Sequence, residues 1–429
     1  MKYCRRCLYP ENHPLHLTFD DAGICSGCRI HEEKDSLDWA EREARLTTLF
    51  SASRSKAPGK FDCIIPVSGA RDSYFIVDTV KRRFGMNPLL LSYNRHHNTP
   101  RGIRNLAYLR TWFDGDYMQH VVAPQRVKAI TRETIHRMGS MYWHVLAGQS
   151  VFPVQIAVRF KIPLIIWGAH QGLDQVGMFS HTDEVEMTRK YRCDHDLMGV
   201  EAEDLVGGTQ GLRESDLVPY MYPHDREISR IGVRGIYLNN FIRWDTKQQH
   251  TDMLERYGYE TGTVPRSFDT CNDVDCQHHS GLHDWVKFAK WGYGRASDHA
   301  SREIRLRRMT REQGIDMVAK YQDTPPADKQ TFLDWVGLNA REFDGEIDRF
   351  RDPRIWERAK GSWQLRDSIL NHREDSGVDA ARLPIKEDWS EFPVTDTKDP
   401  DADESAYVLM ARGYSNDHRV RPEWPAPRS

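Results

Sequence analysis

The sequence of 429 residues lacks features that mark several classes of protein. No apolar run approaches the ~18 residues that a membrane-spanning helix needs. No hydrophobic stretch follows the basic start MKYCRRC, so a secretory signal is not expected. The 60 basic and 63 acidic residues give a net charge of -3, which provides no electrostatic attraction for a nucleic-acid backbone. We therefore expect a cytoplasmic protein that binds neither membranes nor nucleic acids.

Disulfide bonds are also not expected, because eight cysteines in a long chain without a signal do not form a disulfide framework. Four of them form two C-x-x-C pairs near the start, Cys4 with Cys7 and Cys25 with Cys28. Two such pairs can direct four thiolates to one tetrahedral ion, and sulfur ligands suit Zn²⁺. Four thiolates leave no open coordination position, so we predict a structural zinc site. The alternative is two redox-active thiol pairs.

The middle of the chain alternates short apolar runs with amphipathic segments. Strands are predicted at 63–67, 88–93, 117–123 and 163–167, and helices at 73–84, 103–113, 126–138 and 150–160. This alternation predicts an α/β fold with a parallel sheet covered on both faces. Ligands of such sheets bind beyond the carboxyl ends of the strands.

The rest of the chain differs from this middle part. Residues 29–60 are charged and are interpreted as a linker. After about residue 245 the strand signal stops, and helices are predicted at 251–258, 283–291, 297–308, 311–321 and, more weakly, 328–350. We therefore divide the chain into a zinc-binding segment with linker (1–57), an α/β domain (58–245), a helical substrate or partner region (246–371) and a polar tail (372–429). The tail either extends over the surface or serves as the arm of a homo-oligomer.

One loop carries a recognisable chemical pattern. Within Pro66–Ser73, residues Ser68, Gly69, Asp72 and Ser73 match the PP-loop pattern S-G-G-x-D-S, directly after a predicted strand. Backbone amides and serine hydroxyls at the start of a helix form a cradle for phosphates, and Asp72 can bind Mg²⁺. The loop contains neither the G-K-[ST] of a Walker A loop nor a G-x-G-x-x-G fingerprint. The alternative is an ordinary strand-to-helix turn rich in small residues.

Together with further motifs, the loop makes the chain resemble a known family, the N-acetyl sugar amidotransferases of lipopolysaccharide and sialic-acid-like sugar biosynthesis. These belong to the PP-loop ATP pyrophosphatase superfamily. The resemblance extends from residue 1 to about 370. Besides the loop and the cysteine pairs it rests on Phe152–Ala157, Ile162–Gly168, Gly232–Leu238, His283-Asp284, Gly292–Arg295, Asp298-His299 and Met309–Glu312.

The resemblance implies a PP-loop domain of the adenine nucleotide alpha hydrolase-like fold and an ATP-dependent carbon–nitrogen ligase. Such an enzyme adenylates the acetamido oxygen of an N-acetylated sugar or nucleotide sugar, releases pyrophosphate, and uses ammonia from a partner glutamine amidotransferase to form an acetamidine. ATP, Mg²⁺ and structural Zn²⁺ are the implied cofactors. The implied catalytic residues are Asp72, Ser73 and Arg295. The implied nucleotide-binding residues are Ser68, Gly69, Ala70, Arg71, Asp72, Ser73, Tyr93, Asn94 and Gly168.

Three positions depart from the family pattern. Ala70 replaces the second glycine of the loop, Arg71 replaces a lysine, and Ala169-His170 stands where a glutamate is common. A methyl group at residue 70 would be strained if the backbone there needed a positive φ. Three carboxylates are candidates to replace the missing glutamate: Asp174, Glu184 and Glu186.

Two side chains of the helical region are candidate ligand contacts. Arg295 and His299 are predicted to contact phosphate or sugar; alternatively, Arg295 pairs with Asp298 on the surface of an aromatic core formed by Trp285, Phe288, Trp291 and Tyr293. A second metal at Cys276, His278, His279 and His283 is a weaker hypothesis than a solvated turn.

Two other functions remain open. One is sulfur transfer, as in PP-loop tRNA thiolases, which need a basic surface and extra active-site cysteines. The net charge of -3 argues against it, and only Cys63 and Cys193 lie in the α/β part. The other is a non-catalytic nucleotide-binding scaffold, suggested by Ala70 and Ala169.

Overall fold

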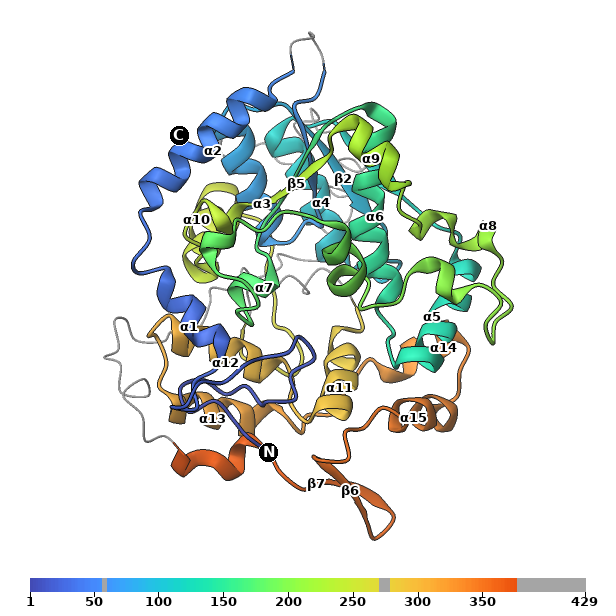
Figure 1. The fold of residues 1–429 in the computed structure, drawn as a ribbon. Coiled ribbons are helices and arrows are strands. Elements are labelled where there is room, and N and C mark those ends of the chain that lie inside the picture. The colour runs from blue at the N-terminus through green and yellow to red at the C-terminus, as the bar shows by residue number, and fades with distance from the viewer. Residues whose placement is uncertain (56–59, 270–277, 376–429) are drawn as a thin grey trace.

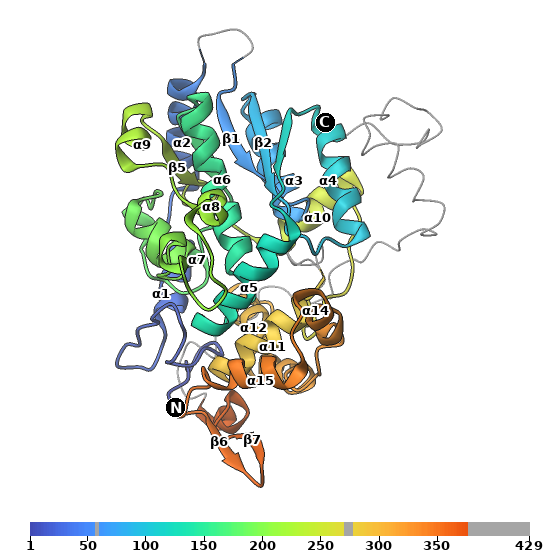
Figure 2. The same ribbon diagram turned by 90° about the vertical axis from the view of Figure 1, so that its right-hand side faces the viewer.

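The computed structural model describes residues 1–55, 60–269 and 278–375 of the chain. An α/β part with a central sheet lies at one end, and helices α11–α15 gather at the other (Figures 1 and 2). The N-terminal segment lies beside these helices in both views. No helix among the described residues is long and apolar enough to cross a membrane.

The sheet has five parallel strands in the order β3-β2-β1-β4-β5. Its strands are β1 (Cys63–Pro66), β2 (Pro88–Tyr93), β3 (Tyr117–His120), β4 (Leu164–Trp167) and β5 (Arg234–Tyr237). The predicted α/β fold class with a parallel sheet is confirmed. Strand β5 was not among the predicted strands, because its four residues begin with an exposed residue followed by a glycine and give little pattern.

Helices cover both faces of the sheet, and the side chains of β1 show why its run is apolar throughout. Ile65 belongs to a core with Phe50 and Tyr74. Ile64 packs on the opposite face with Phe152 and Ile228. Because successive side chains of a strand point to opposite faces, a doubly covered strand has no polar side.

The helices of the α/β part begin and end as follows: α2 (Trp39–Ser53), α3 (Arg71–Val77), η1 (Asp78–Arg83), α4 (Pro100–Phe113), α5 (Pro124–Met138), α6 (Trp143–Phe160), α7 (Gln171–Asp174), α8 (Glu214–Leu217), α9 (Asp225–Ile231) and α10 (Thr246–Tyr257). Short helical turns connect them: η2 (His181–Asp183), η3 (Tyr191–Asp196), η4 (Ala202–Leu205), η5 (Val218–Tyr220) and η6 (Leu238–Asn240).

The interpretation of residues 29–60 as a linker is wrong over most of its length. Helix α1 (Ser26–Glu33) and α2 occupy it, and the side chain of Asp38 caps α2 by accepting hydrogen bonds from two backbone amides. Leu46 and Phe50, one helical turn apart, are buried in the sheet core. The many charged residues of this segment lie on the other side of an amphipathic helix, which concealed its apolar stripe.

The C-terminal region is helical, as predicted, but it also contains strands. Its elements are α11 (Ser280–Trp291), α12 (Arg295–Arg305), α13 (Arg311–Tyr321), α14 (Lys329–Val336), α15 (Ala340–Asp348) and η7 (Ile369–Asp375). The expectation that no strand follows residue 245 is wrong, because β6 (Trp356–Ala359) and β7 (Ser362–Leu365) form an antiparallel hairpin. Each strand has four residues, too few for a clear alternation.

The predicted domain boundaries separate elements that pack against each other in the structure. Helix α10 packs against α3 in the sheet core, although the boundary at residue 245 assigns it to the helical region. The N-terminal segment packs on α12 and α13 through Tyr3 and Leu8. Most of the tail, residues 376–429, lies outside the described residues.

Candidate functional site

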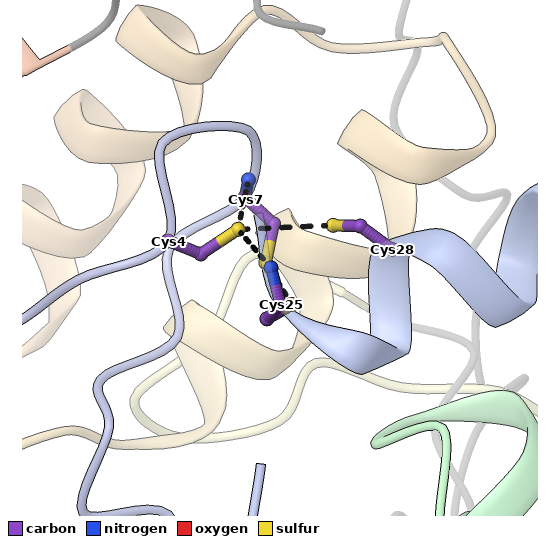
Figure 3. Close-up of side chains that lie close together, drawn as sticks. All are labelled: Cys4, Cys7, Cys25 and Cys28. Carbon is purple, nitrogen blue, oxygen red and sulfur yellow. Dashed lines mark hydrogen bonds between the residues drawn. The ribbon is translucent and has the colours of Figure 1, made fainter. Parts of the chain in front are cut away.

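The four N-terminal cysteines converge on one point (Figure 3). Their sulfur atoms all lie within 4.8 Å of one another, and all four side chains are buried. The Sγ atoms of Cys7 and Cys25 lie 3.6 Å apart, and those of Cys4 and Cys28 lie 4.0 Å apart. A tetrahedral ion with Zn–S bonds of ~2.3 Å places its sulfurs about 3.8 Å apart, so the four thiolates fit zinc.

Backbone amide donors surround the sulfur of Cys4. The Cys4 sulfur accepts hydrogen bonds from the backbone amides of Arg6, Cys7 and Cys25, at 3.3–3.4 Å. Amide donors of this kind stabilise negative charge on sulfur. Four thiolates around Zn²⁺ carry a net charge of about -2, and that charge needs a partner when it is buried.

Arg305 at the end of α12 provides this partner. Its guanidinium contacts Cys28 at 3.4 Å, Cys25 at 3.6 Å and Cys7 at 3.7 Å. Burial alone disfavours the charge of Arg305, but the thiolates of Cys28, Cys7 and Cys25 raise its pKa well above the usual value. Arg305 could not be predicted from the sequence, since it lies 277 positions from Cys28 and no local pattern marks it.

The PP-loop-like segment joins β1 to α3 at the carboxyl edge of the sheet. Gly69 has φ +85°, and a Cβ there would lie 2.8 Å from the backbone nitrogen of Leu106, so only glycine fits. Ala70 has φ -77° and ψ 170°, an extended conformation that an alanine adopts without strain. The departure at residue 70 therefore does not distort the loop.

The hydroxyl groups of the two loop serines accept hydrogen bonds from backbone amides of the same loop. The Ser73 hydroxyl accepts a hydrogen bond from the Ser68 amide at 2.9 Å, and the Ser68 hydroxyl accepts one from the Ala70 amide at 3.3 Å. Helical backbone then continues from α3 through η1 to Arg83. The loop thus precedes a helix of three turns, and the dipole of such a helix favours an anion at its start.

We expect Gly69→Ala to destabilise the protein by about 1–2 kcal/mol, the cost of a left-handed conformation for a residue with a Cβ, with the Leu106 contact adding to it. Ala70→Gly is the matched control, and it should cost less than about 1 kcal/mol because residue 70 already has ordinary angles. Urea unfolding of both variants measures the difference. Equal stabilities would contradict the assigned loop conformation.

The helical region contributes side chains close to this loop. The positive charges of Arg302, Arg295 and Arg71 all act on His299, whose pKa lies well below the usual value, chiefly because the ring is buried. Arg71 of the loop therefore lies within electrostatic range of His299 on α12. Arg71 is itself buried, and its Nε lies 3.1 Å from Asp72 Oδ1. His299 Nδ1 is hydrogen-bonded to the Ser267 hydroxyl at 2.5 Å.

Arg295 does not pair with Asp298, so that alternative is wrong. Asp298 pairs with Lys287 instead. The Arg295 backbone amide donates to Asp284 at 2.5 Å and its Nη2 donates to the Ser280 carbonyl at 3.2 Å, whereas the buried Nη1 has no hydrogen-bond partner among the described residues. An unpartnered buried guanidinium nitrogen fits an anionic ligand such as a phosphate group.

The other predicted nucleotide-binding residues lie along the same edge of the sheet. Tyr93 ends β2, Asn94 follows it, and Gly168 follows β4. Strands β1 and β4 lie side by side although β2 and β3 separate them along the chain, so the order of strands reverses between them. Parallel sheets bind ligands at this kind of crevice. Asn94 Oδ1 is already used within its loop, where it accepts from the His96 amide and from Asn98.

The candidates for the missing glutamate are engaged in ion pairs. Glu184 pairs with Arg45 and Glu186 with Arg234, both near the surface. Asp174 of α7 pairs with Lys34, whose side chain is 1% exposed. His170 is buried, stacks on His195 with 4.7 Å between ring centroids, and has a pKa lowered to about 3 by burial and by His195. At neutral pH His170 is thus uncharged and does not replace a carboxylate.

A second metal site is not assembled among the residues that the structure describes. There, the four N-terminal cysteines are the one group of three or more ligand side chains close enough to share an ion. Cys276 lies outside the described residues. His283 stacks on Tyr142, with ring centroids 4.6 Å apart.

Comparison with protein families finds a match in the helical region. Residues 251–369 match the family described as LPS biosynthesis protein WbpG-like, C-terminal domain. We refer to residues 251–369 as the WbpG-like domain because of this similarity. The resemblance to a lipopolysaccharide-biosynthesis family that the motifs predicted is confirmed over these residues. The WbpG-like domain contains Arg295, His299 and the zinc-site partner Arg305.

No curated protein matches the chain. Among solved structures, NMN synthetase from Francisella tularensis is similar, with 14% sequence identity and a TM-score of 0.25, over 50% of this chain and 96% of that chain. With so low a TM-score, the fold assignment rests on the strand order and loop of this chain alone.

Proposed function

We propose that the chain is an ATP-dependent amidotransferase that converts the acetamido group of an N-acetylated sugar or nucleotide sugar into an acetamidine. The observation that carries this proposal is the meeting of two parts at one place. The loop Ser68–Ser73 follows β1 beside the strand-order reversal, and His299 of α12, in the WbpG-like domain, lies within electrostatic range of both Arg295 and Arg71 of that loop.

The reaction balances as an adenylation followed by a displacement. The amide oxygen attacks the α-phosphorus of ATP and pyrophosphate leaves, which gives an O-adenylyl imidate. Ammonia then adds to the imidate carbon and AMP leaves with the former amide oxygen. The net change is amide, ATP and ammonia to amidine, AMP and pyrophosphate. Activation is needed because an amide carbonyl is a poor electrophile whose oxygen is a poor leaving group.

The residues of the chain supply the polar groups that this reaction requires. The loop amides, with the Ser68 and Ser73 hydroxyls, would bind the pyrophosphate group, and Arg295 Nη1 would bind a phosphate oxygen. Asp72 would hold Mg²⁺, which neutralises charge on the phosphates. The arginine at residue 71 keeps the positive charge of the usual lysine next to Asp72.

The ammonia donor is proposed to be a separate class I glutaminase with a synthase-barrel subunit. No cysteine of the given sequence stands in the G-x-C-x-G elbow of a glutaminase, and Cys4 belongs to the group of four cysteines. The zinc site is proposed to be structural.

Sulfur transfer is less well supported by the geometry of the described residues. Cys63 is buried at the amino end of β1, opposite the loop, and burial raises the pKa of its thiol. Cys193 lies in η3, where burial followed by Glu201 raises the pKa of its thiol. Neither is the low-pKa thiol at the carboxyl edge that a persulfide carrier needs.

Pyrophosphate release from ATP tests the proposal. The assay contains the full chain, Mg²⁺, ammonium chloride and either UDP-N-acetylglucosamine or UDP-N-acetylgalactosamine. We expect release that depends on both the sugar nucleotide and ammonia. Release that needs tRNA and a sulfur donor would support the thiolase reading, and no release under any condition would support a scaffold.

A further inference from the structure

Four histidines gather at the carboxyl end of β2, outside the residues used so far. His96 and His97 lie in the loop after β2, His144 lies in the first turn of α6, and His279 is the residue before α11. The His97 ring centroid is 4.7 Å from that of His279 and 6.3 Å from that of His144. The Trp335 ring of α14 meets His97 edge-on at 4.3 Å.

Several ring nitrogens of this histidine cluster (His96, His97, His144, His279) have no protein partner. His144 Nδ1 is hydrogen-bonded to the Tyr93 hydroxyl at 3.1 Å, which in turn contacts the Tyr220 hydroxyl at 2.7 Å. In contrast, Nε2 of His97, Nε2 of His144 and Nδ1 of His279 are buried without a hydrogen-bond partner among the described residues. The His144 and His279 residues are only 1% and 8% exposed. Each buried polar atom left unpaired costs about 1–3 kcal/mol, so these nitrogens are expected to serve a ligand.

The cluster suits an uncharged ligand. Burial lowers the pKa of His97 to about 3, with smaller contributions from neighbouring histidines, and lowers that of His144 well below its usual value. A neutral imidazole offers one donor and one acceptor, which fits hydroxyl and amide groups, whereas a phosphate group needs donors only. Two charged groups near the cluster are Asp328, 4.0 Å from His279 Nδ1, and Lys128, over the Trp335 ring at 5.7 Å.

The cluster lies along the same sheet edge as the phosphate loop. Strand β2 pairs with β1 in parallel, with Leu91 beside Pro66, so Tyr93 and the segment after it lie next to the segment that contains Ser68. The WbpG-like domain supplies His279 and Trp335, and the α/β part supplies His97 and His144. A ligand bound here would contact both parts of the chain.

We propose that His97, His144 and His279, together with Trp335, bind the sugar ring of the acceptor through its hydroxyl and acetamido groups. This inference rests on the proposed function for the identity of the acceptor. The acceptor sugar would then bind between the carboxyl end of β2 and the WbpG-like domain, and the ATP phosphates would bind at the loop after β1.

Titration calorimetry of the full chain with UDP-N-acetylglucosamine, UDP-N-acetylgalactosamine, UDP and ATP tests it. His144→Asn keeps a polar atom near Tyr93 but removes Nε2, the ring nitrogen proposed to contact the sugar. We expect it to weaken binding of the sugar nucleotide roughly tenfold, the worth of one hydrogen bond to a buried group, without changing ATP or UDP affinity. His144→Gln, whose amide reaches farther, should lose less. His97→Asn, at a less buried position, is the second variant if His144→Asn fails to fold.

His136→Asn is the matched control, because His136 pairs with Glu346 away from the cluster. A loss of ATP affinity in place of sugar-nucleotide affinity would overturn the inference, as would a wild type that binds neither sugar nucleotide more tightly than UDP. Parallel assays of pyrophosphate release separate the two proposals. Binding that depends on His144 without any release would reject the amidotransferase alone, and release with unchanged half-saturation in the variants would reject the sugar site alone.

Discussion

Asp72→Asn is expected to abolish pyrophosphate release from ATP. Asp72 is the acidic residue of the loop, and its Oδ1 lies 3.1 Å from Arg71 Nε. The amide keeps the shape of the side chain but removes the charge that would hold Mg²⁺ beside the phosphates. Loss of such an electrostatic contribution typically costs a factor of about 10²–10³ in rate.

The measurement is a coupled pyrophosphate assay, with zinc content and circular dichroism as checks that the fold is intact. Asp252→Asn is the matched control, since Asp252 lies half-buried on α10, where it accepts a hydrogen bond from Gln248. Wild-type turnover in the Asp72 variant would reject the assignment of this loop to ATP.

Cys25→Ser is expected to release the zinc and to unfold the N-terminal segment. Structural Zn²⁺ contributes on the order of 10 kcal/mol in small zinc-binding peptides. The segment around the cysteines has a small core of its own, formed chiefly by the cysteines, Tyr9, Leu17 and Ile24 with Val176 and Tyr293. Without the ion, that core does not hold the segment against α12. Zinc per chain, measured by mass spectrometry, and protease cleavage within residues 1–28 report both effects.

Arg305 allows a finer test of the same site. Arg305→Met removes the positive charge next to three cysteines and should weaken zinc retention about 10–100-fold, as expected for groups that support metal ligands. Arg307→Met is the matched control, because Arg307 pairs with Asp35, at 3.5 Å, and not with the cysteines. A chelator such as EDTA should strip zinc faster from the Arg305 variant than from the control. Equal rates would show that Arg305 does not stabilise the metal site, and full zinc content in Cys25→Ser would contradict the four-cysteine site itself.

The features that depend on neighbouring residues could be predicted from the sequence. The buried strands β1, β2 and β4 are continuous apolar runs, and the loop after β1 has a fixed pattern of small residues and one acid. The spacing of the two cysteine pairs predicts a shared metal site, because each C-x-x-C turn directs two sulfur atoms toward the same point. Whether Ala70 strains the loop depends on its backbone φ, which the sequence does not give and which is -77° in the structure.

The features that depend on distant residues could not be predicted. The ion pair of Lys34 with Asp174 and the contact of Arg305 with Cys28 join segments that are 140 and 277 residues apart. Helix α2 was missed because its charged residues concealed an apolar stripe, and β5 because a strand of four residues with an exposed start gives little pattern. His97 and His144 came together only when β2 and α6 packed, with the Gly148 backbone against the Tyr93 ring.

Oxygen transfer tests the central claim most directly. The acceptor sugar nucleotide is prepared with ¹⁸O in its acetamido carbonyl and incubated with the full chain, ATP, Mg²⁺ and ammonium chloride. Adenylation of the amide oxygen predicts that the label leaves with AMP, one ¹⁸O atom for each acetamidine formed, with none in pyrophosphate. Label that stays in the sugar product, or AMP that forms without it, would contradict the account.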